Sequence, residues 1–388
     1  TLSIVVFSLF AIIFPSFLMT TFYPYTTNLQ PFESSVWLVP IISSNSILLV
    51  IGFAYYRKKL PLQIYKGIEF ILNFEISKKT ALLTGIIILV VYIGFSLPEL
   101  AIDEATQYDD WGVLESALEV WPSTDSDDIY INEQNTRYVR MLLLDASSDL
   151  FQNIKLLPFV ASILLVVVTF FLTYQITQKR FAGIISMVIL LQSHTFLHFD
   201  TIAVYENFWV LFYVVSLYAI NKKWQYSSIS YLLSIFSKAF IAVFFLSSLY
   251  YICRASISTR KKLYTLASYA ASLIVILLVF SFGESIYFDI INISSSEFFL
   301  AFNALGYTLR YDLIIVLSLL PLTLGLFFKF RKENSKKVDS ILVLILTALL
   351  AGPVISMLTD FYFILPYRFL PLIVFVAVGI GVLLSKKN

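Results

Sequence analysis

Residues 156 to 191 read LLPFVASILLVVVTFFLTYQITQKRFAGIISMVILL. The stretch contains one long apolar run, 156 to 176, and the beginning of another, 181 to 197, with only a short polar connection between them. A helix that crosses the hydrocarbon core of a bilayer needs about 20 mostly apolar residues. The whole chain is 59% hydrophobic and only 13% charged, whereas a soluble domain is usually about a quarter charged. These features predict an all-α polytopic integral membrane protein.

Apolar runs of this kind recur along the whole chain. Their number and length predict a bundle of about twelve transmembrane helices, with both chain ends on the cytoplasmic side. The stretch 226 to 253 is read as two short spans, because only this count keeps the strongly basic connections on one side of the membrane. The predicted spans are 2 to 20, 35 to 55, 81 to 97, 156 to 176, 181 to 197, 203 to 220, 226 to 237, 239 to 253, 263 to 281, 311 to 328, 339 to 358 and 367 to 385.

The charged residues are segregated between the two sides of this predicted membrane. All but four of the 25 acidic residues fall on one side, and all but six of the 27 lysines and arginines fall on the other. The positive-inside rule assigns the basic side to the cytoplasm. The outer face is therefore acidic, and it is where we expect the chemistry. The six basic residues on that face are Arg137, Arg140, Lys155, Lys238, Arg310 and Arg368.

The sequence divides into two regions. Residues 1 to 80 contain two predicted spans and, within 60 to 77, an amphipathic helix expected on the cytoplasmic membrane surface. Residues 81 to 388 form a transmembrane core with two outer loops, 98 to 155 and 282 to 310. The first loop includes the amphipathic stretch WGVLESALEVW, residues 111 to 121. Loops of this length are usually functional or disordered, so these two are the first places to look for a site.

Acidic residues gather at the beginning of the first outer loop, close to the predicted membrane surface. They are Asp103, Glu104, Asp109 and Asp110. Carboxylates at such a boundary can bind a cation, and one with a raised pKa can act as a general base. A solvated acidic loop is the alternative interpretation.

Two of the outer basic residues lie next to apolar spans. Lys238 is in SIFSKAF, between the two short spans, and Arg368 is in PYRFLPLIV, at the start of the last span. Cations at such depth are costly and normally face a protein interior or polar cavity with an anionic partner. The partner could be a loop carboxylate or a lipid-borne phosphate, since both cation types bind phosphate.

The two histidines, His194 and His198, are spaced i and i+4 and are followed by Asp200 and Glu206. This spacing could chelate a divalent metal, or the histidines could simply be hydrogen-bonded at the interface. The chain has no Gly-rich phosphate loop and no basic patch interleaved with aromatic residues, so no nucleic-acid partner is expected. The single cysteine excludes an intramolecular disulfide framework.

The motifs together resemble the GT-C membrane glycosyltransferases, in the branch of the protein O-mannosyltransferases and the bacterial lipid A aminoarabinose transferase. In that branch an acid pair is followed by an alanine eight positions after the first acid. Asp109, Asp110 and Ala117 have this spacing, whereas Trp111 stands eight positions after Asp103. The stretch 156 to 191 resembles the second and third core spans of the family. The stretch SIFSKAF, with Lys238, resembles the family's segment that carries a lysine between two short spans. The stretch PYRFLPLIV, with Arg368, resembles the family's segment that carries an arginine at the start of a late span.

The resemblance implies a glycosyl transfer on the outer face of the membrane, most simply the plasma membrane of a prokaryote. The donor would be a sugar on a polyprenyl or dolichyl phosphate, and the acceptor a hydroxyl of a protein, glycan or lipid. Asp109 would be the general base of an inverting reaction. The implied residues are Asp109 and Asp110 for catalysis and Lys238, Arg368, Arg137 and Arg310 for the donor phosphate, with Asp103, Glu104, Asp200 and Glu206 as secondary candidates.

Two other classes of function remain open at this stage. A transporter or flippase for lipid-linked or anionic solutes could use the same buried cations, and a scaffold subunit of a larger membrane complex would suit the two additional N-terminal spans. Transporters often have interrupted spans at matching positions in two halves. The sequence has no such pair, which favours the transferase.

Overall fold

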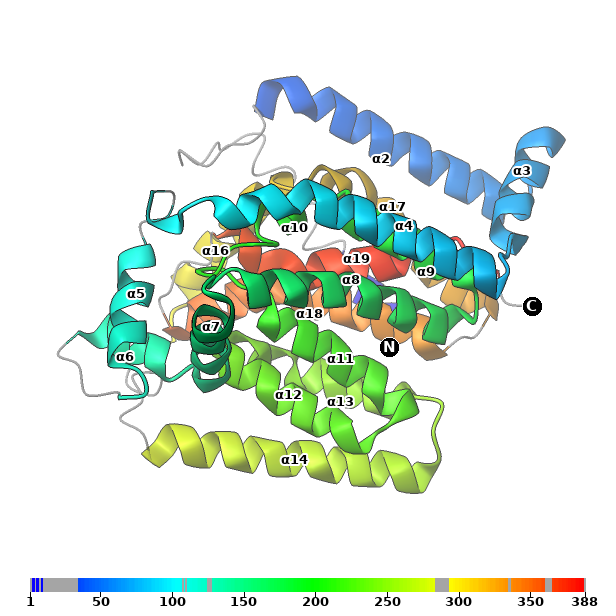
Figure 1. Ribbon diagram of the computed structural model, residues 1–388. Coiled ribbons are helices and arrows are strands. Elements are labelled where there is room, and N and C mark those ends of the chain that lie inside the picture. Colours follow the sequence, from blue (N-terminus) through cyan, green and yellow to red (C-terminus); the bar gives the residue numbers. More distant parts are fainter. Residues whose placement is uncertain are drawn as a thin grey trace. The chain divides into compact units, whose positions relative to one another are not determined.

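The computed structural model describes residues 34–106, 108, 110–123, 128–282, 293–333, 336–359 and 365–386, with residues 2, 3, 5, 6, 8 and 9 near the N-terminus. Every regular element in this part of the chain is a helix (Figure 1). Seven helices among the described residues are long and apolar enough to cross a membrane, and three more are apolar but shorter. The chain therefore has the helices of a multi-pass membrane protein. The count of twelve spans stays a prediction.

The seven long apolar segments fall within α2 (Ser34–Tyr56), α4 (Lys78–Ser96), α8 (Leu156–Thr177), α14 (Thr259–Phe282), α17 (Leu313–Glu333), α18 (Lys336–Thr359) and α19 (Leu370–Leu383). The segment of α4 continues into the 3-10 helix η1 (Leu97–Ala101), and that of α19 begins with η4 (Pro366–Phe369). The shorter apolar helices are α9 (Arg180–Leu191), α11 (Phe208–Lys222) and the pair η3 (Ala239–Phe244) with α13 (Phe245–Arg254). The remaining helices of the predicted transmembrane core are α10 (His194–His198), α12 (Gln225–Ser237) and α16 (Ser295–Arg310).

The helices form two compact units, and each unit is assembled from separate parts of the chain. The first unit comprises Thr1–Gly85, Thr169–Phe196 and Asn292–Asn388. The second comprises Ile86–Val168 and Leu197–Ile291. The first unit takes helices from both ends of the sequence and from a short stretch in the middle, and the second takes helices from the two stretches between them. The core of each unit therefore depends on contacts between segments that are distant in the sequence.

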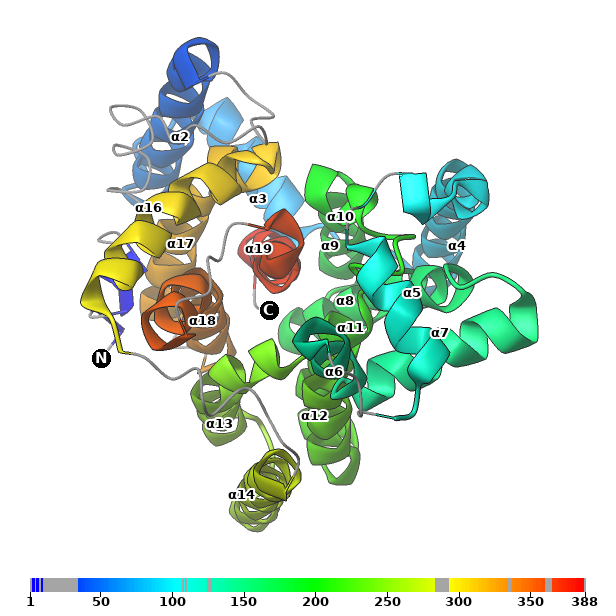
Figure 2. The ribbon, with the colours of Figure 1, turned by 90° about the vertical axis from the view of Figure 1, so that its left-hand side faces the viewer.

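Helix α19 is the buried centre of the first unit. It packs against α9, α17 and α18, and Figure 2 shows α16, α17 and α18 side by side in the same unit. Gly379 and Gly381 let α19 approach its neighbours closely. A Cβ added at Gly381 would lie 2.2 Å from the Ser186 hydroxyl oxygen and 2.6 Å from the Ala182 carbonyl oxygen. Small residues at such crossings allow helix backbones to pack tightly in a membrane.

The amphipathic helix predicted within 60 to 77 is α3 (Leu62–Asn73), and none of its residues is buried. The end of the chain is fixed to it within the first unit. Lys386 donates its backbone N–H to the Leu72 carbonyl at 2.9 Å, and its ammonium lies 2.7 Å from the Glu69 carboxylate. The helix is thus anchored on one side while apolar residues such as Phe70 remain exposed. Its place on the membrane surface stays a prediction.

The second unit contains the first predicted outer loop, which is largely helical. It consists of η1, η2 (Glu104–Thr106), α5 (Trp111–Val120), α6 (Ile129–Asn135) and α7 (Tyr138–Phe151). The predicted amphipathic stretch is α5, which buries Leu114 and Ala117 and exposes its other face. Helices α11 and α12 lie side by side in this unit, and α12 also contacts α7 and α14 (Figure 1).

The apolar stretch around Lys238 is interrupted in the structure. Helix α12 ends at Ser237, Lys238 has an extended backbone with φ −159° and ψ 113°, and η3 begins at Ala239. Helix α11 begins at Phe208, later than the predicted span 203 to 220. The reason is that the main chain of residues 203 and 204 is bound by side chains from the outer loop.

Candidate functional site

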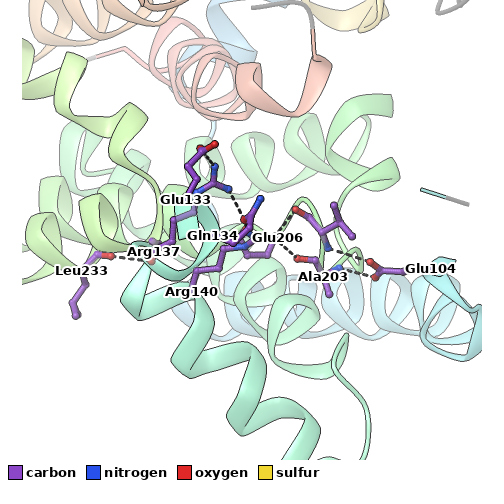
Figure 3. Close-up of polar contacts among 10 residues, drawn as sticks. Glu104, Glu133, Gln134, Arg137, Arg140, Ala203, Glu206 and Leu233 are labelled. Atoms are coloured by element: carbon purple, nitrogen blue, oxygen red, sulfur yellow. Dashed lines mark hydrogen bonds and ion pairs between the residues drawn. The ribbon is translucent and has the colours of Figure 1, made fainter. Parts of the chain in front are cut away.

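The candidate site lies in the second unit, where the non-helical segment 203–206 meets the first outer loop. The backbone N–H groups of Ala203 and Val204 donate to the Glu104 carboxylate at 2.6 and 3.1 Å. The Arg140 guanidinium donates to the carbonyl of Val204 at 2.8 Å and to that of Ala203 at 3.4 Å (Figure 3). One carboxylate and one guanidinium therefore satisfy the donors and acceptors that a helix would otherwise satisfy.

Glu104 is itself a buried carboxyl, with 2% of its surface exposed. Burial raises its pKa, while the two backbone N–H groups and the charges of Lys155 and Arg140 act in the opposite direction. A buried carboxylate with two backbone donors holds its partner segment in a defined conformation, since charged hydrogen bonds are stronger than neutral ones. Glu104 is thus a positioning residue for segment 203–206.

Arg140, on α7, is as buried as Glu104 and connects this segment to a second carboxyl. Its Nε lies 3.7 Å from the Oε1 of Glu206, and both side chains are 2% exposed. It also donates to the side-chain oxygen of Gln134. Burial raises the pKa of Glu206, against the lowering effect of Arg140, Lys238 and Arg137 in that order. Glu206 is therefore a buried carboxyl with Arg140 as its ion-pair partner, and the positive charges of Lys238 and Arg137 also lower its pKa.

These three cations, Arg137, Arg140 and Lys238, form what we call the cation cluster. Arg137 is half-buried, and its guanidinium lies 2.6 Å from Glu133 and donates to Gln134 at 3.0 Å. The Lys238 ammonium lies 5.2 Å from the centroid of the Trp209 ring, which is fully buried. A cation over an indole face is attracted by the ring quadrupole, and the effect is larger where water is excluded.

The acidic motif of the outer loop contacts the same segment through Tyr205. The Tyr205 hydroxyl donates to Oδ2 of Asp110 at 2.7 Å, and its ring packs edge-on against Tyr108 at 5.5 Å. Asp110 is the residue immediately before α5. Asp109 lies outside the described residues, but both of its chain neighbours contact Tyr205. Segment 203–206 thus joins the acidic motif to the cation cluster.

Asp200 lies in the same unit and is fully buried. Its Oδ2 accepts a hydrogen bond from the Ser96 hydroxyl at 2.7 Å. Burial raises its pKa to about 7, and the negative charge of Glu99 adds to this, while the hydrogen bond from Ser96 acts in the opposite direction. Asp103, in contrast, is exposed and accepts the backbone N–H of Ala105 at 3.0 Å.

Of the other predicted site residues, Arg310, Arg368 and His194 belong to the first unit and His198 belongs to the second. Arg368 is in η4 of the first unit, half-buried, and donates to the Tyr367 hydroxyl at 3.3 Å. Arg310 ends α16, and its side chain lies outside the described part. His194 and His198 are exposed on α10, with ring contacts to Tyr311 and Phe199. Within the described ranges no group of three or more His, Cys, Asp or Glu residues could hold a metal ion.

The structure therefore brings Glu104, Asp110 and Arg140 into contact with segment 203–206, and the charges of Lys238 and Arg137 act on Glu206 in that segment. The sequence analysis placed Arg140 on the outer face but did not predict its role in holding segment 203–206. A signal was present, because Arg140 shares a spacing of four and seven residues with Leu144 and Ser147, which are also buried on α7. The contact of Tyr205 with Asp110 has no comparable signal.

No protein-family model, curated protein or solved structure matches the chain, so these comparisons assign it to no family. A functional proposal therefore depends on the geometry of this segment and on the motifs of the sequence.

Proposed function

We propose that the chain is a membrane glycosyltransferase of the GT-C type, with about twelve spans and with its site on the outer face of a prokaryotic plasma membrane. It would transfer a sugar from a polyprenyl or dolichyl phosphate to an acceptor hydroxyl on a protein, glycan or lipid. The observation that carries the proposal is that segment 203–206 contacts both the acidic motif and the cation cluster. Tyr205 binds Asp110 of the acidic motif, and its neighbours Val204 and Glu206 interact with Arg140 of the cation cluster.

This arrangement combines the two functions that the reaction needs. The acceptor hydroxyl must lose a proton as it attacks the anomeric carbon, and a carboxylate can take that proton. The bond from the anomeric carbon to the phosphate oxygen breaks, and the electron pair leaves with the lipid phosphate. Cations in a poorly hydrated site stabilise the charge that develops there. Asp109 is the proposed base, and attack from the side opposite the phosphate would invert the anomeric carbon.

The state of Glu206 is important for phosphate binding. Its raised pKa means that the site takes up a proton on Glu206 more readily than an exposed carboxyl would. Protonation would remove the negative charge nearest to Arg140, whose Nε lies 3.7 Å from Glu206 Oε1. Lys238 would then interact with a donor phosphate, while Arg140 continues to hold the carbonyls of Ala203 and Val204. Arg137, which already binds Glu133, would contribute from the edge of the cluster.

The proposal is tested by donor binding and by the products. Lys238→Met should weaken binding of a polyprenyl-phosphate sugar roughly 10- to 150-fold, since a hydrogen bond to a charged group contributes about 1.5–3 kcal/mol. Lys223→Met is the matched control, because Lys223 is exposed at the opposite end of the α11–α12 pair. Purified protein supplied with the donor and an acceptor should release polyprenyl phosphate. Equal donor binding by both variants would contradict the role of Lys238.

A proton-linked transporter of lipid-linked or anionic solutes is the second candidate, and Asp200 is the observation that favours it. A buried carboxyl with a pKa of about 7 can exchange a proton at physiological pH. In reconstituted vesicles a transporter would move an intact lipid-linked sugar in response to a pH gradient. The transferase would cleave the glycosyl bond with or without a gradient. Movement without cleavage, with every acceptor tried, would favour the transporter.

A further inference from the structure

A cavity of about 640 Å³ lies within the second unit, and Glu104, which binds segment 203–206, is one of its lining residues. Helix α5 contributes Trp111, Glu115 and Glu119 to its wall, and the end of α7 with the residues that follow contributes Ser148 and Gln152. A cavity of this size is in the usual range for a small-molecule site. Its position in the first predicted outer loop places it on the predicted outer face of the membrane.

The charges in the wall disfavour an anionic ligand. Asp103, Glu115 and Glu119 are exposed carboxylates in the lining. Lys155 is the only basic residue among the described residues of the lining, and its ammonium donates to the carbonyls of Glu99 and Ile102 at 2.6 and 3.1 Å. The wall therefore carries more negative than positive charge, and a phosphate or carboxylate would be repelled.

The remaining lining groups suit a ring with many hydroxyls. The indole of Trp111 and the side chain of Leu118 offer apolar surface, which can pack against the C–H face of a sugar. Carboxylates accept hydrogen bonds without donating, so they match hydroxyl donors, while the amide of Gln152 can both donate and accept. A neutral or positively charged saccharide satisfies the shape, the apolar surface and the charge together.

The cavity also has a wall in common with the proposed catalytic segment. Glu104 lines it and binds the backbone N–H groups of Ala203 and Val204. Trp111 lines it and directly follows Asp110 in the chain. We propose that this cavity binds the acceptor, and that the acceptor is a neutral or cationic saccharide. The inference rests on the proposed function, with a hydroxyl of the bound saccharide as the nucleophile that gives its proton to Asp109.

The test is saccharide binding to the 388-residue chain in lipid nanodiscs without any donor, measured by saturation-transfer NMR. Three probes are used: maltose, which is neutral, the disaccharide of chitosan, which carries two amines, and a hyaluronan disaccharide, which carries a carboxylate. Maltose or the chitosan disaccharide should bind, and the hyaluronan disaccharide should bind at least tenfold more weakly than the better of the two. Failure of all three to bind, or preference for the hyaluronan disaccharide, would overturn the inference.

Variants locate the binding. Trp111→Ala and Glu119→Gln should each weaken it at least tenfold, and Glu119 is exposed, so its substitution leaves the fold intact. Trp224→Ala and Asp149→Asn are matched controls, because neither residue lines the cavity. Binding that both cavity variants retain in full would place the saccharide elsewhere and overturn the inference.

Donor cleavage, measured separately, distinguishes this inference from the proposed function. Cleavage of the lipid-linked donor onto a serine peptide or water, by a chain that binds none of the saccharides, would sink the inference and leave the transferase standing. Saccharide binding that depends on Trp111, in a chain that never cleaves a donor, would sink the transferase and support the cavity as a saccharide site.

Discussion

Arg140→Met should be among the most damaging single substitutions in the second unit. The Arg140 guanidinium binds two main-chain carbonyls, the side chain of Gln134 and, as an ion pair, Glu206. Methionine keeps much of the volume but none of these interactions. It leaves Glu206 as a buried carboxyl without its nearest cation. Removing one partner of a buried ion pair typically costs about 3–5 kcal/mol, and we expect a loss of this size in the free energy of unfolding.

Arg137→Met is the matched control, because Arg137 is one turn away on the same part of the chain. Its guanidinium binds Glu133, but 18% of its side chain is exposed. A pair of this kind contributes little, so the expected loss is below about 1 kcal/mol. The double variant Arg140→Met with Glu206→Gln should lose less than Arg140→Met alone, because the uncompensated carboxyl is then removed.

Unfolding can be followed by tryptophan fluorescence during titration with SDS in mixed micelles. Near-equal losses for Arg140→Met and Arg137→Met would refute the account of Arg140 as the buried centre of the cluster. A double variant that is less stable than Arg140→Met alone would show that Glu206 stabilises the fold through other contacts, which would also contradict this reasoning.

Three further predictions concern pH, packing and topology. The pKa of Asp200 is about 7 in the folded chain against an ordinary value of 3.8, so stability from this group is present at low pH and is lost as pH rises from about 4 to 7, by up to about 4 kcal/mol. Asp200→Asn should remove this dependence and melt at a higher temperature than the wild type above pH 7; a parallel pH profile would contradict the assignment. Gly381→Ala should cost about 1–3 kcal/mol by overpacking, since its Cβ would lie 2.2 Å from the Ser186 hydroxyl oxygen, whereas Gly52→Ala meets nothing within 4 Å and should cost nothing in the same thermal assay. Cys253, the only cysteine, is exposed at the predicted cytoplasmic end of α13. A membrane-impermeant maleimide should therefore label it only after cells are permeabilised. Labelling in intact cells would contradict the predicted orientation of the chain in the membrane.

Much of the helical framework is predictable from the sequence because it depends on local properties. Long apolar runs identify helices such as α8 and α18. The amphipathic pattern of residues 111 to 121 predicts α5, because its apolar positions recur at helical spacing. Each of these features can be read within a window of about 20 residues.

The arrangement of the site could not be predicted in the same way, because it depends on contacts between distant residues. Glu104 binds Ala203, which is 99 positions away, and Tyr205 binds Asp110, which is 95 positions away. No periodicity or charge pattern encodes these pairs. The late start of α11 follows from them, since segment 203–206 would otherwise extend an apolar helix. The helical propensity of this segment is overridden by hydrogen bonds from another part of the unit.

The most direct test of the proposed transferase is the rate of glycosyl transfer by Asp109→Asn. The purified variant is given a labelled polyprenyl-phosphate sugar and an acceptor, and donor binding is measured in parallel. Asparagine has nearly the shape of aspartate but cannot accept the proton, so transfer should fall ~10²- to 10⁴-fold while donor binding is unchanged. Asp149→Asn, an exposed substitution on α7, should keep the wild-type rate. A full transfer rate in Asp109→Asn, with normal donor binding, would contradict the assignment of the base.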